Sequence, residues 1–145
     1  MSYPRPWNSY RQISTQTASP GQLVLMLYDG ALRFLEQSLS GFEKDDPIEF
    51  NQTINNNVLR AQSILGELNS TLNMEQGGDL ARTLRGLYGY LDDRLMESNV
   101  RKSPDGIRET IQRLTVLRDA WQEMLHQPAT GAAQSTETTN LYACG

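Results

Sequence analysis

Residues 19–42, SPGQLVLMLYDGALRFLEQSLSGF, decide the fold of this chain. The segment opens like a helix: Ser19 can accept a hydrogen bond from a free backbone amide, Pro20 suits the first helical position, and Gln22 can complete a capping box. We therefore expect a helix over about 20–42. Apolar residues occupy more than one side of its first two turns: Leu23, Val24, Leu25, Met26, Leu27 and Tyr28. Such a helix is expected to be enclosed on several sides, by sibling helices or by a partner that arrives later.

A second helix is expected over about 47–73, beginning at an Asp46-Pro47 cap. Its apolar residues are spaced 4, 3, 4, 3 and 4 apart, as in the seam of a helical bundle: Ile54, Val58, Ala61, Leu65, Leu68 and Leu72. Ile64 lies beside this seam, so the second helix also has apolar surface to spare.

Two more helices complete the pattern. The third follows Gly77-Gly78, with Asp79 as its expected cap, and ends near Asn99; its stripe is Leu80, Leu84, Leu87, Leu91 and Leu95. The fourth opens at Ser103-Pro104, as the first opens at Ser19-Pro20, and Pro128 marks its end. Its apolar face is Ile107, Ile111, Leu114, Leu117 and Trp121.

Short connections force consecutive helices to run antiparallel, so the pattern predicts an all-α fold, an antiparallel up-down four-helix bundle over residues 19–126. We expect residues 1–18 to form an N-terminal arm or short extra helix. Tyr10 and Ile13 of this arm could dock over the exposed apolar side of the first helix, and a frayed leader that docks only loosely on the bundle is the competing interpretation. Residues 127–145 are rich in Ala, Thr, Ser, Gln and Gly, and we expect a disordered tail there.

Composition narrows the class of protein. A length of 145 residues favours a single domain, and a net charge of −4 argues against nucleic-acid binding, which needs a concentrated basic face. The longest apolar run, Leu23 to Tyr28, is far shorter than the ~20 residues that span a bilayer, and the first residues do not resemble a signal peptide. The single cysteine, Cys144, excludes an internal disulfide. We expect a cytoplasmic protein without membrane insertion.

The sequence lacks the residues that form the known kinds of catalytic site in helical bundles. A di-iron centre needs two inward-facing Glu-x-x-His pairs, whereas the only histidine is His126. Phosphotransfer through His126 is also disfavoured, because this residue lies at a helix C-terminus, where the dipole favours a cation. No Gly-rich phosphate loop, nucleophile elbow or metal-spaced Cys/His cluster occurs. The sequence therefore indicates a binding protein and not an enzyme, with no metal and no cofactor.

Three segments, in the right order, resemble the flagellar secretion chaperones of the FliS family. Residues 8–35 read NSYRQISTQTASPGQLVLMLYDGALRFL, which is similar to the family's aromatic-containing arm, Ser-Pro helix start and Leu-x-x-x-Leu-Tyr-x-Gly motif. Residues 72–99 read LNMEQGGDLARTLRGLYGYLDDRLMESN, which is similar to its Gly-Gly, Leu-Tyr-x-Tyr and Arg-Leu-x-x-x-Asn pattern. Residues 114–124 read LTVLRDAWQEM, which is similar to its Leu-Arg-x-Ala-Trp element. Ser98 departs from the alanine that is usual in the family.

The resemblance implies a cytoplasmic export chaperone that binds the disordered C-terminal segment of flagellin in apolar grooves and prevents premature polymerisation before flagellar type III secretion. The N-terminal arm would cover part of this surface until it is displaced. An amphipathic client helix would be read through apolar anchors at i, i+3, i+4 and i+7. The expected partner-binding residues are Tyr10, Ile13, Leu23, Leu27, Tyr28, Ile64, Leu68, Leu87 and Tyr90. For each helix residue, ordinary core packing is the competing interpretation.

Other functions stay open at this stage. The surplus apolar surface could be buried by a second copy of the chain. The protein would then be a self-associating bundle that forms a homodimer. The chain could also be a regulatory adaptor that sequesters another flagellar protein, such as an anti-sigma factor, and the flagellar export apparatus is a further candidate partner.

Overall fold

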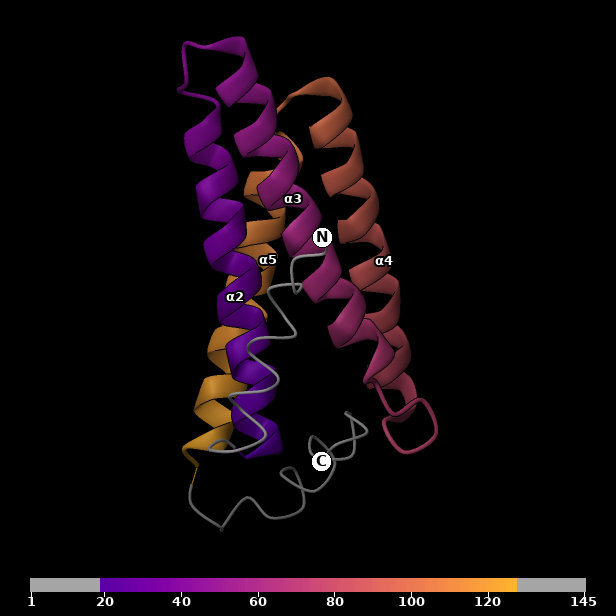
Figure 1. Ribbon diagram of the computed structural model, residues 1–145. Helices are drawn as coiled ribbons and strands as arrows, with labels where there is room; N and C mark the ends of the chain where they lie inside the picture. The colour runs from indigo at the N-terminus through magenta and orange to yellow at the C-terminus, as the bar shows by residue number, and fades with distance from the viewer. Residues whose placement is uncertain (1–18, 128–145) are drawn as a thin grey trace, which may run out of the picture.

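The computed structural model describes residues 19–127. In this part of the chain it shows α2 (Pro20–Gly41), α3 (Pro47–Ser70), α4 (Gly78–Arg101) and α5 (Asp105–Leu125). Consecutive helices pack side by side and α2 also packs against α5, which closes a ring of antiparallel neighbours (Figure 1). The prediction of an all-α, up-down four-helix bundle is confirmed over these residues. The expected arm at 1–18 and residues 128–145 of the expected tail lie outside the described residues.

The first two helices begin where the sequence predicts. At the start of α2 the capping box is complete: the Gln22 backbone amide donates to Ser19 Oγ at 3.2 Å, and the Ser19 amide donates to Gln22 Oε1 at 3.3 Å. At the start of α3 the Ile48 amide donates to Asp46 Oδ1 at 3.0 Å. Each cap satisfies backbone amides that have no partner inside the helix.

The cap expected at Asp79 is wrong. The helix α4 begins at Gly78, one residue before Asp79. Its N-cap is Gly77, which makes no side-chain hydrogen bond. Asp79 instead lies in the first turn, where its negative charge favours the positive end of the helix dipole, and it forms an ion pair with Arg82.

The buried face of α4 is rotated from the expected stripe. The residues that it buries are Ala81, Leu84, Tyr88, Leu91, Leu95 and Ser98. Leu80, by contrast, is 45% exposed, and Leu87 is only partly buried. The rotation places Tyr88 in the core, where its hydroxyl lies 2.5 Å from the hydroxyl of Tyr28 on α2. Burying these two polar groups together satisfies both and connects the helices across the bundle.

The turn between α4 and α5 brings their backbones into close contact. Lys102 ends α4 with φ 50°, and α5 begins at Asp105, whose amide donates to Ser103 Oγ at 3.4 Å. One residue later, a Cβ atom on Gly106 would lie 2.5 Å from the carbonyl oxygen of Arg94. Glycine is therefore required at position 106, because a side chain would push α5 away from α4.

We predict that Gly106→Ala destabilises the fold by about 1–3 kcal/mol, since the new methyl group must displace backbone atoms. Gly86→Ala is the matched control, because Gly86 is exposed in mid-helix and a Cβ there meets no atom within 4 Å. It should stabilise the fold by about 0.5–1 kcal/mol through helix propensity. Urea denaturation of the two variants measures both changes, and equal changes in the two would refute the close contact at Gly106.

Candidate functional site

An open groove lies between α4 and α5. It has a cavity volume of about 320 Å³ and is lined by Leu87, Gln112, Arg113, Val116 and Leu117. Leu87 and Leu117 are partly buried and pack against the core, while Val116 is 65% exposed. Leu87, Val116 and Leu117 thus form an apolar wall of the groove that continues into the core.

Helix geometry brings these side chains to one place. On α5, Val116 and Leu117 follow Arg113 by three and four residues, so all three lie along the edge that faces α4. On α4, Tyr90 follows Leu87 by three residues and lies on the same edge. On each helix this edge lies beside the stripe of residues that packs into the core. Its side chains are therefore exposed or only partly buried.

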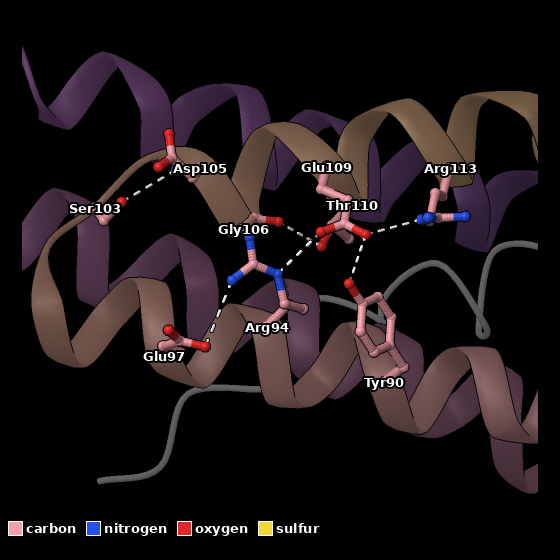
Figure 2. Close-up of polar contacts among 9 residues, drawn as sticks. All are labelled: Tyr90, Arg94, Glu97, Ser103, Asp105, Gly106, Glu109, Thr110 and Arg113. Carbon is pink, nitrogen blue, oxygen red and sulfur yellow. Dashed lines mark hydrogen bonds and ion pairs between the residues drawn. The ribbon is translucent and has the colours of Figure 1, made fainter.

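A polar cluster closes the groove toward the α4–α5 turn (Figure 2). Its centre is Glu109 on α5, which accepts hydrogen bonds from Tyr90 Oη at 2.8 Å and from Arg94 Nε at 2.9 Å, both on α4. Arg113 Nε, one turn further along α5, also donates to Glu109, at 2.9 Å. The Arg113 guanidinium lies 6.0 Å from the centre of the Tyr90 ring, within range of a cation–π contact. Figure 2 shows Tyr90 and Arg94 pointing from α4 toward the Glu109 carboxylate.

These contacts fix the protonation state of the cluster. Hydrogen bonds from Tyr90, Arg113 and Arg94 lower the pKa of Glu109 from 4.5 to about 2. The bond to Glu109 is also the main cause of the raised pKa of Tyr90 and of Arg94. At neutral pH the carboxylate is therefore ionised and the phenol keeps the proton that it donates.

The apolar start of α2 forms a second partly exposed surface. Val24, Leu27 and Tyr28 are buried, whereas Leu23, Leu25 and Met26 are only partly covered. Two contacts tie this helix to α5: Trp121 Nε1 donates to the Gly21 carbonyl at 2.8 Å, and Arg118 Nε donates to Asp29 at 2.7 Å.

Within residues 19–127, no three His, Cys, Asp or Glu side chains are grouped so that they could hold a metal ion. His126 is exposed just after the end of α5. Over the same residues, each helix is too short or too polar to span a membrane.

Comparison with known proteins identifies the family. The family model of the flagellar protein FliS matches residues 3–128. The chain belongs to the FliS family. It is 34% identical to the flagellar secretion chaperone FliS of Bacillus subtilis over 125 residues, which cover 86% of this chain and 90% of that protein. It is 35% identical to FliS of Campylobacter jejuni, with 81% and 89% covered, and 31% identical to FliS of Salmonella typhimurium, with 80% and 87% covered.

Within residues 19–127, the structure separates the residues expected to bind a partner of this FliS chain into three groups. Leu87 and Tyr90 lie together at the α4–α5 groove, and Leu23 lies on the partly exposed surface of α2. Four others are buried in the core: Leu27, Tyr28, Ile64 and Leu68. Tyr10 and Ile13 lie outside the described residues.

The predicted partner-binding set lacks four of the five groove-lining residues, Gln112, Arg113, Val116 and Leu117, and it lacks Glu109 of the polar cluster. Val116 carried a usable signal, because it is a large aliphatic residue that lies off the predicted stripe of α5 and is therefore exposed. The two charged residues carried none, since alternating charges along a helix read as an ordinary solvated face.

We predict that Glu109 makes the stability of the fold depend on pH in the acidic range. Its folded pKa of about 2 lies below 4.5, so its ionised form stabilises the fold fully above about pH 4.5, and this contribution is lost as the pH falls toward 2. Glu109→Gln should therefore destabilise the protein at pH 7, and the difference from the wild type should shrink at pH 2.5.

Denaturation with urea at pH 7, 4 and 2.5 measures this dependence. The matched control is Glu123→Gln, which removes an exposed carboxylate elsewhere on α5 and should leave stability nearly unchanged at each pH. A Glu109→Gln deficit that is the same at pH 7 and pH 2.5 would contradict the assigned ion pairs.

Proposed function

We propose that this protein is a cytoplasmic, non-enzymatic export chaperone for flagellin. It binds the disordered C-terminal segment of flagellin and prevents premature polymerisation before secretion through the flagellar type III apparatus. The observation that carries the proposal is the exposed apolar groove between α4 and α5, in a chain whose relatives are named flagellar secretion chaperones.

The groove suits recognition of a helix. An amphipathic helix presents apolar side chains at i, i+3, i+4 and i+7, and here they would pack on Leu87, Val116 and Leu117. Burial of apolar surface contributes about 25 cal/mol per Å², whereas ordering a disordered segment costs 2–5 kcal/mol or more. A groove of this size cannot bind such a client tightly by itself, so the client must also touch other surfaces.

The start of α2 is the second contact in this proposal. Leu23 and Met26, three residues apart and so on the same side of the helix, are both partly exposed there. Leu27 and Tyr28 on α2, like Ile64 and Leu68 on α3, would reach the client only if it opened the packing between helices, because they are buried in the free chain. Tyr10 and Ile13 would cover this surface until the client displaces them.

The test is a calorimetric titration of the full chain with a peptide of the C-terminal segment of flagellin. We predict saturable binding with a negative heat-capacity change, because apolar surface is buried. Val116→Gln should weaken binding by about tenfold, the effect of losing most of one buried valine side chain. Val100→Gln is the control, because Val100 is 78% exposed on α4 and does not line the groove.

Two outcomes would refute the proposal. One is the absence of heat at micromolar peptide. The other is a dimer that persists at nanomolar concentration in sedimentation and does not bind the peptide, which would favour self-association.

We also predict that Tyr10→Ala changes client affinity while the melting temperature stays nearly the same, since Tyr10 belongs to the arm in this proposal. Thermal denaturation and the same titration measure the two effects. A large loss of stability would show instead that Tyr10 is part of the folded core.

A further inference from the structure

We propose that Arg113 forms an ion pair with an acidic side chain of the client helix, and that Glu109 positions Arg113 for this contact. This inference rests on the proposed function and adds a chemical requirement for the segment that binds. The occupant of the α4–α5 groove is then an amphipathic helix with an acidic residue about one turn from an apolar anchor.

Arg113 has donors to spare. Its side chain is 52% exposed and lines the groove. A guanidinium group carries five N–H donors, and here the Nε donor is used by Glu109. Within residues 19–127, neither terminal nitrogen of Arg113 takes part in a hydrogen bond. These terminal nitrogens are the donors that a carboxylate binds in a forked, two-bond geometry.

Arg113 itself carries the charge that an acidic partner needs. It shares the carboxylate of Glu109 with a second arginine, Arg94. Glu109 shares its two oxygens among three donors, so it does not neutralise Arg113 alone. The exposed Arg113 guanidinium therefore favours an acidic client side chain and disfavours a basic one.

The cluster holds Arg113 in place before any client arrives. Its Nε is bonded to Glu109, and its guanidinium lies over the Tyr90 ring, whose hydroxyl is bonded to the same carboxylate. Because these contacts restrict the side chain in advance, less conformational entropy is lost when the carboxylate binds. Lysine would not reproduce this arrangement, since it lacks the planar fork and the Nε donor.

The apolar anchor and the charge lie at helical spacing. Val116 follows Arg113 by three residues, and Leu87 faces both from α4 across the groove. A client side chain seated between Leu87 and Val116 therefore places the next turn of its helix beside Arg113. The occupant that fits is a foreign amphipathic helix with this pattern.

A double-mutant cycle on the full chain tests the inference. Fluorescence anisotropy measures the affinity for the flagellin C-terminal peptide and for versions in which each acidic residue is replaced in turn by its amide. One replacement should weaken binding to the wild type by about fivefold at low salt. The same replacement should cause no further loss with Arg113→Gln.

Two further variants sharpen the cycle. Arg85→Gln is the matched control: it removes the same charge from an exposed residue of α4, two positions from Leu87 and so on a different side of the helix, and should leave the effect of the peptide replacement intact. Arg113→Lys keeps the charge but loses the fork, and it should recover only part of the discrimination.

The outcomes separate this inference from the proposed function. If all peptide versions bind the wild type equally, or if Arg113→Gln weakens acidic and amide peptides by the same factor, the ion pair is refuted while chaperone binding stands. If no peptide binds the wild type, both fail. If Arg113→Gln instead dissociates a dimer of this chain in sedimentation, the acidic group belongs to a second copy, and the client assignment is refuted.

Discussion

The backbone contact at Gly106 is the constraint on which the groove depends. The turn over residues 102–104 places α5 directly against α4, where a Cβ on Gly106 would lie 2.5 Å from the Arg94 carbonyl. One turn further, the space between the helices is filled by the polar cluster around Glu109. Beyond this cluster the two helices separate in Figure 1, and the groove opens at Leu87 and Val116. Tight closure at one end thus fixes the position of the opening.

Three of the five residues that line the groove are apolar, because α4 and α5 each carry more apolar residues than the core can enclose. On α4, Tyr88 is buried against Tyr28, and this rotation moves Leu80 and Leu87 to the flank of the helix. On α5, the core takes Leu114 and leaves Val116 65% exposed. Exposed aliphatic groups gain nothing from water, so a surface of this kind contributes to free energy only when another chain covers it.

Local rules explain which parts of the fold were predictable. The capping box of α2, the start of α3 and the apolar stripes of α3 and α5 depend on residues three or four apart, and all of them appear in the structure. The rotation of α4 was not predictable. Its leucines recur at helical spacing and suggest a different buried face, whereas Tyr88 is buried through its partner Tyr28, which lies 60 residues away in the sequence.

The candidate site was only partly predictable for the same reason. Leu87 and Tyr90 were found through family motifs, but such motifs mix residues of the core with residues of the surface. Leu27 and Tyr28 were found through the same motifs and Ile64 and Leu68 through apolar spacing, and all four are buried. Glu109 joins Tyr90 across 19 residues, and no periodic pattern marks a polar contact between two helices. Charged residues at such a groove can therefore be identified only from the three-dimensional structure.

The arrangement also bears on how a client could be held and later released. The rim of the groove is fixed by hydrogen bonds within the protein, so in the proposed complex most of the ordering cost would fall on the client and little on this chain. A groove of about 320 Å³ accepts only a few side chains, so in the proposed complex the affinity would be distributed over this site and the surface of α2. Binding that is distributed in this way can be lost one contact at a time, because each local contact is weak and only their linkage makes the complex tight. A client held by linked weak contacts can leave segment by segment, while the four-helix core that supports both surfaces stays folded.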